Sequence, residues 1–289
     1  MKLALGTAQF GMEYGIANNN GKVRLEEAKA IITLGRLAGI DTLDTAMAYG
    51  DSEESLGKLS TEDFHVITKL PSFGSTSKNL QEMVRDQVVN SLAKLKQSKL
   101  SGLLLHRPDE LLSDVGAEIW LALNAVKEEG LVDLIGYSIY SPDELDSIYS
   151  NYQPDIVQAP YNIIDRRLCS SGWIDRLHSD GVEIHVRSIF LQGLLLMEAA
   201  LRPVKFDEWS HLWSTWDNWL ESNNLTKLQG ALQFALSNPK ITKVVVGVDS
   251  ATQLEEIIRA AELGMKDSYP SELSSDCVRL INPANWGGL

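Results

Sequence analysis

Asp44, Tyr49, Lys69 and His106 are the residues whose types and spacing point most directly to chemistry. An unperturbed tyrosine has a pKa of about 10, so it is a weak acid at neutral pH unless a cation stands beside its phenol. Lys69 ends an apolar run and is the candidate cation, and Asp44 would keep its ammonium group charged. We therefore expect Tyr49 to exchange a proton with a substrate.

Taken singly, these residues also have ordinary structural explanations. Asp44 could cap a turn, Lys69 could be a surface ammonium group, and His106 could be a hydrogen-bonded core histidine. What favours a functional role is that all four, Tyr49 included, lie at or just after the ends of consecutive apolar runs. If these runs are neighbouring strands of a barrel, the four side chains share one site.

The elements that would position this site follow from short apolar runs alternating with longer amphipathic segments. Two of the amphipathic segments, 25–38 and 80–95, predict helices. Strands that alternate with helices pair in parallel. Eight such units in 289 residues favour an α/β fold of one domain (1–289), a (β/α)8 TIM barrel, over an open sheet. The expected strands are Leu3–Thr7, Thr42–Ala46, Val66–Leu70, Gly102–His106, Leu134–Ser138, Ile156–Ala159, Glu183–Ser188 and Lys243–Val248.

The composition, with 44% hydrophobic and 22% charged residues, is that of a globular protein with a full core. A net charge of −13 argues against nucleic acid or an anionic membrane as a partner, because both need a basic face. Cys169 and Cys277 have no metal-ligand spacing, so neither a metal site nor a disulfide is expected. The N-terminus is too quickly polar for a signal peptide, and no run reaches the roughly 20 apolar residues of a membrane span. A cytoplasmic location is expected.

The segment around 202–224 interrupts the regular alternation and is rich in tryptophan. A spacing of three or four residues is helical, so one interpretation is a small helix that packs on the barrel. The other is an insertion at the barrel mouth whose tryptophans shape a substrate pocket, because barrel active sites lie on that face. The tryptophans are Trp209, Trp213, Trp216 and Trp219.

The sequence resembles the aldo-keto reductase superfamily over nearly its whole length. The most specific match is Asp44–Glu53, followed by Leu56 and Gly57. Weaker blocks agree with it in their order along the chain. They are Gly6–Gly11, Thr68–Lys69, Leu105–Pro108, Gly136–Ser138, Val157–Gln158, Tyr161–Asn162, Leu191–Leu194 and Gly247–Glu256.

The resemblance implies roles that agree with the chemistry of the four residues. Tyr49 would give a proton to a substrate carbonyl oxygen as hydride arrives at the carbon. Lys69, held charged by Asp44, would lower the pKa of the phenol and stabilise the developing alkoxide. His106 would orient the carbonyl by a hydrogen bond or assist the proton transfer.

The resemblance also implies a nicotinamide cofactor bound without a Rossmann fold, NADP(H) as the family default with NAD(H) as the alternative. Arg187 stands where many relatives stack an aromatic ring on the nicotinamide, and Ile139 replaces a common asparagine. Asp249 places a carboxylate where NADP-preferring relatives usually offer a cation, which would repel a phosphate. The expected cofactor contacts are Gly6, Thr7, Ser138, Gln158, Arg187, Leu191, Gln192, Gly193, Gly247, Asp249, Ser250, Gln253 and Glu256.

The expected function is therefore NAD(P)H-dependent reduction of an aldehyde or ketone to an alcohol. Gln9, Tyr140 and Asn162 would contact the substrate, a sugar or sugar-derived carbonyl, together with the tryptophans of the insertion. A nicotinamide-binding regulatory or interaction subunit is the alternative, which has no need of all four reactive residues. A barrel isomerase would require a metal or a two-base site, and the sequence shows neither clearly. Oligomeric state is left open.

Overall fold

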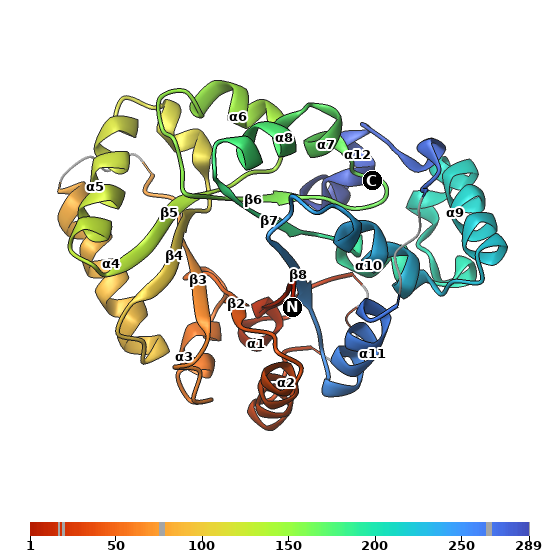
Figure 1. Ribbon diagram of the computed structural model, residues 1–289, viewed down its shortest axis with the longest axis horizontal. Coiled ribbons are helices and arrows are strands. Elements are labelled where there is room, and N and C mark those ends of the chain that lie inside the picture. Colours follow the sequence, from red (N-terminus) through yellow and green to blue (C-terminus); the bar gives the residue numbers. More distant parts are fainter. Residues whose placement is uncertain (17, 19–20, 75–78, 264–267, 289) are drawn as a thin grey trace.

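Eight parallel strands close into a barrel in which each strand pairs with the next along the chain and β8 pairs with β1 (Figure 1). The structure, a computed structural model, describes residues 1–16, 18, 21–74, 79–263 and 268–288. The predicted (β/α)8 barrel is confirmed, and every expected strand is present with ends that differ by at most two residues. The strands are β1 (Leu3–Gly6), β2 (Thr42–Asp44), β3 (His65–Leu70), β4 (Leu100–Leu105), β5 (Val132–Ser138), β6 (Ile156–Pro160), β7 (Glu183–Arg187) and β8 (Lys243–Gly247).

The inside of the barrel changes from apolar to polar along the strands. Side chains two residues apart on a strand point to the same face. Ile67, Leu104 and Ile156 form a small buried cluster with Leu134. Closer to the C-terminal ends of the strands, the side chains that point into the barrel are polar. Because the strands are parallel, these polar groups lie together at one end of the barrel. These polar side chains are Asp44, Lys69, Ser138, Gln158 and Arg187.

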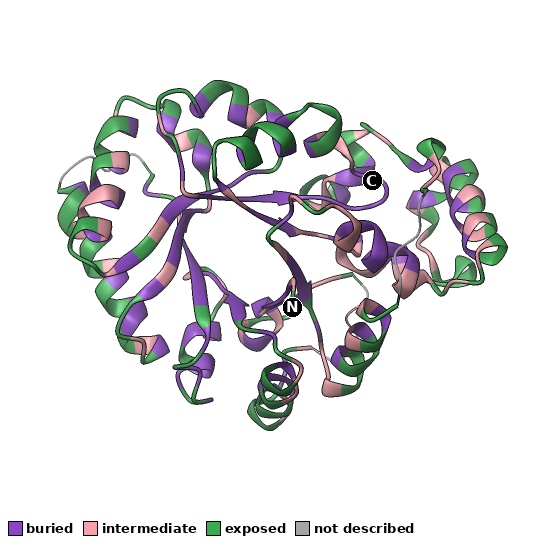
Figure 2. Cartoon of the chain, in the orientation of Figure 1, coloured by how far each residue is buried: buried purple, intermediate pink, exposed green. Residues whose placement is uncertain are grey.

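Helices cover the outward faces of the strands, with buried residues toward the strands and exposed ones toward solvent (Figure 2). Helix α2 (Leu25–Leu37) ends one residue before the predicted end, and α4 (Leu80–Leu95) has the predicted ends. Within the described ranges, no helix is both long and apolar enough to cross a membrane. The other helices are α1 (Ala8–Gly11), α3 (Ser52–Leu56), α5 (Gly116–Glu128), α6 (Pro142–Ile148), α7 (Arg167–Ser170), α8 (Trp173–Ser179), α9 (Ser210–Ser222), α10 (Lys227–Ser237), α11 (Ala251–Ala261) and α12 (Val278–Ile281), with 3-10 turns η1 (Pro108–Leu112), η2 (Leu191–Leu196), η3 (Ala199–Leu201), η4 (Val204–Trp209), η5 (Ser271–Leu273) and η6 (Pro283–Gly288).

The tryptophan-rich segment forms η4 and α9 at one edge of the barrel (Figure 1), where α9 lies against η5. Trp213 and Trp216 are buried, and their indole N–H groups donate to the carbonyls of Phe206 at 2.9 Å and Leu195 at 3.3 Å. The rings of Trp216 and Trp219 stack with centroids 5.6 Å apart. The indoles therefore hold this helix against the barrel.

Candidate active site

Asp44 and Lys69 form a buried ion pair where β2 and β3 approach their C-terminal ends. Lys69 Nζ donates to both carboxylate oxygens at 2.8 Å and to the carbonyl of Thr45 at 2.9 Å. The side chain of Lys69 is 1% exposed and that of Asp44 is 6% exposed. Burial lowers the pKa of Lys69, and the charge of Asp44 opposes that effect. The carboxylate therefore sustains a positive charge in a place that excludes water.

Tyr49 is held in place by backbone contacts between the loops that follow β1 and β2. A Cβ atom on Gly11 would lie 1.7 Å from the carbonyl oxygen of Tyr49, so α1 can approach this loop only at a glycine. Gly50 has a φ of 56°, and a Cβ there would lie 2.3 Å from the carbonyl oxygen of Gly11. With its backbone fixed in this way, the Tyr49 ring lies with its centroid 5.2 Å from Lys69 Nζ.

His106 follows β4 and lies beside the same phenol. The rings of His106 and Tyr49 meet edge to face, with centroids 5.9 Å apart. Burial, followed by the charges of Lys69 and Arg187, lowers the pKa of His106 to about 4. The imidazole is therefore neutral at neutral pH and can donate one hydrogen bond while accepting another.

The pKa of Tyr49 is raised above its usual value, first by burial and then by the charge of Asp44. The sequence predicts the opposite direction, with Lys69 as the cation that lowers it. The structure differs because Lys69 is balanced by two equal contacts with Asp44, and Arg187 is the cation that acts to lower the phenol pKa. Tyr49 is thus protonated at neutral pH and can donate its proton.

A chain of hydrogen bonds links Arg187 to the ion pair across the barrel. Arg187 Nε donates to Ser138 Oγ at 3.4 Å, and Ser138 Oγ donates to Gln158 Oε1 at 3.4 Å. Gln158 Nε2 donates to Asp44 Oδ1 at 2.6 Å. Ser138 and Gln158, expected to contact the cofactor, thus lie next to the ion pair, fully buried and behind the residues that line the cavity.

A cavity of about 930 Å³ extends from Asp44 and Tyr49 to the start of α11. A cavity of this volume is in the range of ligand pockets. Twelve of the expected site residues line it. Gln9 rests on the end of β8, where a Cβ on Gly247 would lie 2.7 Å from its Nε2 atom. The expected residues in the lining are Gly6, Thr7, Gln9, Asp44, Tyr49, Arg187, Gln192, Gly193, Gly247, Asp249, Gln253 and Glu256.

The loop after β7 forms one wall of this cavity in an unusual backbone conformation. Ser188, Leu191, Gln192 and Gly193 all have positive φ, at 60°, 49°, 53° and 92°. For residues other than glycine this costs of order 1–3 kcal/mol each, and such residues cluster at ligand sites. Gln192 and Gly193 line the cavity, whereas Leu191 is fully buried beneath them.

At the far end of the cavity, Asp249 and Gln253 lie at the start of α11. Ser250 Oγ accepts the N–H of Gln253 at 3.2 Å, as a helix cap, and does not line the cavity. The Gln253 side chain reaches back and accepts the N–H of Asp249 at 2.8 Å, one residue before the cap residue Ser250. Burial raises the pKa of Asp249, and its Oδ1 is buried without a hydrogen-bond partner among the described residues. This oxygen can accept a hydrogen bond from a ligand.

Two expected substrate contacts, Tyr140 and Asn162, are not brought into the lining. The ring of Tyr140 lies under the guanidinium group of Arg187, with Cζ 4.6 Å from its centroid. Asn162 is fully buried and donates to the carbonyl of Ser188 at 3.0 Å, while its Oδ1 accepts the N–H of Asp165 at 2.8 Å. Asn162 therefore shapes the loop after β7 from behind.

The tryptophans of the insertion do not line the cavity either. Among the described residues of α9, the lining comes from Asp217, Leu220 and Glu221. The indoles instead face the protein interior, so the structure contradicts their expected contact with a substrate. The physical reason is that burying large rings, two of them almost completely, stabilises the helix more than exposing them at a pocket.

Tyr14 is a lining residue that sequence reasoning missed. Burial raises its pKa, and its hydroxyl group interacts with the side chain of Gln192, another lining residue. The signal that could have found it is the aromatic residue next to Gly15 in the loop after the first strand.

No group of three His, Cys, Asp or Glu residues that could hold a metal ion occurs within the described ranges. The polar groups around Tyr49 instead include two cations, Lys69 and Arg187. Both carry donors that can stabilise negative charge on an oxygen atom.

Comparisons with known proteins agree with this architecture. A family model described as "Aldo/keto reductase family" matches residues 2–274. The chain is 26% identical over 280 residues to an L-galactose dehydrogenase from Arabidopsis thaliana, covering 88% of this chain and 85% of that protein. It is 24% identical over 276 residues to a probable voltage-gated potassium channel subunit beta from Oryza sativa subsp. japonica, covering 83% of each.

A solved structure has the same fold. The holo form of an aldo-keto reductase from Bacillus halodurans superimposes with a TM-score of 0.72 at 21% sequence identity. The match covers 92% of this chain and 88% of the other.

Proposed function

This chain belongs to the aldo/keto reductase family, and we propose that it reduces an aldehyde or ketone to an alcohol with a nicotinamide nucleotide as hydride source and Tyr49 as proton donor. Family membership supports carbonyl oxidoreduction in general. The cofactor, the role of Tyr49 and the kind of substrate are proposals that rest on the geometry of the site.

The observation that carries the proposal is a protonated phenol at a cavity wall beside a buried ammonium–carboxylate pair. A carbonyl oxygen near Tyr49 would accept its proton, and Lys69, 5.2 Å from the ring centroid, would stabilise the negative charge that develops. Neutral His106 could donate a hydrogen bond to the same oxygen. The ion pair is already formed, so little reorganisation is needed during the reaction.

The residues present fit a nicotinamide nucleotide. When bound, this cofactor would supply a hydride to the carbonyl carbon. The cavity runs from Tyr49 past the positive-φ loop at Gln192 and Gly193 to the start of α11, which suits an extended ligand. The unpartnered oxygen of Asp249 matches a ribose hydroxyl group, the acceptor role that acidic residues have in other nicotinamide sites.

The choice between the two nucleotides depends on Asp249. NADP(H) is the default implied by the family, whereas the carboxylate of Asp249 would repel a 2′-phosphate and accept a hydrogen bond from a 2′-hydroxyl. Glu256 and Glu221 add further acids to the lining. We propose that the cavity accepts NADH at least as well as NADPH.

Fluorescence titration with NADH and NADPH is the direct test, because seven tryptophans provide a signal. Binding of either nucleotide, followed by its oxidation with an aldehyde, is the expected result. If neither nucleotide binds even at millimolar concentration, the proposal loses its hydride source and must be abandoned.

A nicotinamide-binding regulatory subunit is the second candidate, and the relative named as a potassium channel subunit beta is the observation that favours it. If the protein is such a subunit, the Tyr49→Phe variant should keep the biological effect of the wild type. The buried pair next to Tyr49 favours the reductase, because binding alone has no use for a proton donor.

A further inference from the structure

Arg187 is the last residue of β7 and lines the cavity together with Tyr49. Its guanidinium group is half-buried. Its charge acts to lower the pKa of Tyr49, His106 and Lys69, so it lies within electrostatic reach of the groups that would handle a carbonyl. Arg187 and Tyr49 therefore face the same cavity.

Within the described part of the chain, the hydrogen bonds of Arg187 all go to neutral groups. Nη2 donates to the carbonyl of Ile139 at 2.9 Å, Nη1 to Ser188 Oγ at 3.2 Å and Nε to Ser138 Oγ at 3.4 Å. A guanidinium group has five N–H donors, so two remain after these three contacts. Stacking on Tyr140 holds the guanidinium plane in place.

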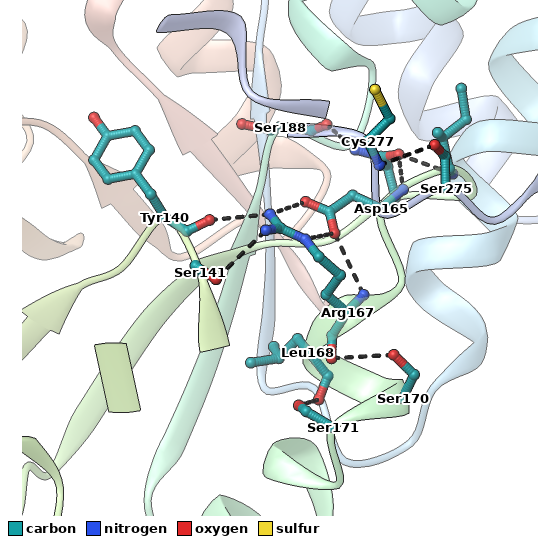
Figure 3. Close-up of polar contacts among 12 residues, drawn as sticks. Tyr140, Ser141, Asp165, Arg167, Leu168, Ser170, Ser171, Ser188, Ser275 and Cys277 are labelled. Atoms are coloured by element: carbon teal, nitrogen blue, oxygen red, sulfur yellow. Dashed lines mark hydrogen bonds and ion pairs between the residues drawn. The ribbon is translucent and has the colours of Figure 1, made fainter. Parts of the chain in front are cut away.

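No carboxylate among the described residues forms an ion pair with Arg187, although its neighbours are paired. Asp44 is matched by Lys69. Arg167 binds both oxygens of Asp165 at 2.8 Å and 2.9 Å, and it also donates to the carbonyl of Tyr140 at 3.1 Å (Figure 3). The charge of Glu144 lies within electrostatic reach of Arg187 but forms no ion pair with it among the described residues, so the guanidinium group has no direct counter-ion there.

We infer that Arg187 binds a carboxylate of the substrate, so that the preferred carbonyl compound is an anion such as a 2-oxo acid or an acidic sugar. This inference rests on the proposed reduction and names its substrate class. A half-buried charge without a counter-ion is costly, and a guanidinium group with two unused donors matches the two oxygens of a carboxylate. Proximity to Tyr49 places the carboxylate close to the carbonyl group.

The same charge has a consequence for the cofactor. A cation beside the nicotinamide position disfavours the positively charged oxidised ring, and a carboxylate on the substrate would offset this repulsion. An anionic substrate therefore suits the site in both oxidation states of the nucleotide.

The test compares matched carbonyl pairs that differ in one carboxylate: glyoxylate with methylglyoxal, and D-glucuronate with D-xylose. In the wild type we expect kcat/KM to favour the acid of each pair. Arg187→Met should lower kcat/KM about 10- to 100-fold more for the acids than for their neutral partners. Arg187→Lys should retain part of the preference.

The matched control is Arg107→Met, which removes one positive charge at an exposed position next to His106. It should leave the preference intact. Binding of oxamate, an unreactive 2-oxo acid analogue, is measured by calorimetry with and without saturating NADH, and Arg187→Met should weaken it at least tenfold.

Equal loss for acids and neutral compounds, or weakened NADH binding by Arg187→Met, would overturn the inference and assign Arg187 to the cofactor. Equal oxamate binding by wild type and Arg187→Met would also overturn it. Neither result contradicts the proposed reduction. That proposal fails only if no nucleotide binds, or if neither acidic nor neutral carbonyl compounds are reduced.

Discussion

The ammonium group of Lys69 donates a 2.8 Å hydrogen bond to each oxygen of the Asp44 carboxylate, inside a barrel that hides both side chains from water. This symmetric contact balances two charges that would be costly alone. It also explains why the nearby phenol of Tyr49 responds to Arg187 rather than to Lys69.

Breaking this pair should destabilise the protein strongly. Asp44→Asn leaves Lys69 buried without its counter-ion, and we expect a loss of about 3–5 kcal/mol in the free energy of unfolding measured with urea. The double variant Asp44→Asn with Lys69→Met should recover much of this loss. Glu129→Gln, which breaks the exposed pair with Arg85, should cost about 1 kcal/mol or less. Additive effects of the two buried substitutions would contradict this prediction.

Replacing the phenol should separate chemistry from binding. Tyr49→Phe removes the proton donor but keeps the ring, so we expect kcat to fall about 10²- to 10⁴-fold while the Kd for NADH stays the same. Stopped-flow measurement of NADH oxidation gives the rate, and fluorescence titration gives the Kd. Tyr152→Phe, which changes a tyrosine packed against Trp120 outside the cavity, is the control. Full activity of Tyr49→Phe would show that Tyr49 is not the proton donor.

His106 should make the stability depend on pH in the acid range. Its pKa is about 4 in the folded protein and about 6.5 when unfolded, so the unfolded state binds more protons between these values. Neutral His106 makes its full contribution to the free energy of unfolding above pH 6.5. As the pH falls toward 4, the free energy of unfolding decreases by roughly 1–3 kcal/mol.

The measurement is urea unfolding at several pH values for the wild type and His106→Gln, which lacks the titrating group. The variant should show a smaller drop between pH 6.5 and 4 than the wild type. Replacing the exposed His178 by glutamine should leave the curve unchanged. Parallel curves for the wild type and His106→Gln would refute the prediction.

Asp249 should control the choice of nucleotide. Asp249→Ser removes a carboxylate next to the expected 2′-position, so the ratio of NADPH to NADH affinity should rise about tenfold or more. Glu255→Gln removes the same charge from an exposed position on α11 and should leave the ratio unchanged. The measurement is titration of both variants with both nucleotides. An unchanged ratio of NADPH to NADH affinity in Asp249→Ser would mean that this carboxylate does not face the ribose.

Trp216 should matter for stability rather than for contact with a ligand. It is fully buried, and Trp216→Ala would leave a large cavity under α9 that costs about 3–5 kcal/mol. Trp209→Ala, at a partly buried position in η4, should cost less. Urea unfolding compares the two, and equal small losses would show that the indoles do not anchor α9.

The sequence alone determined the barrel and the position of the reactive residues along it. Few other folds accommodate apolar runs of strand length that alternate with amphipathic helices in a chain of this length. A residue at the end of a parallel strand reaches the same face whatever its neighbours are. That is why Tyr49, Lys69 and His106 could be named as one site.

Only the tertiary structure decided how these groups share their charges. Gln158 donates to Asp44 across 114 residues of sequence. Among the residues that the structure describes, Lys69 has a carboxylate partner and Arg187 has none. Sequence patterns report which face a residue occupies, whereas a pairing depends on distances between side chains of different strands. The tryptophans of α9 show the same limit, because helical spacing is identical for rings that face a pocket and rings that face the core.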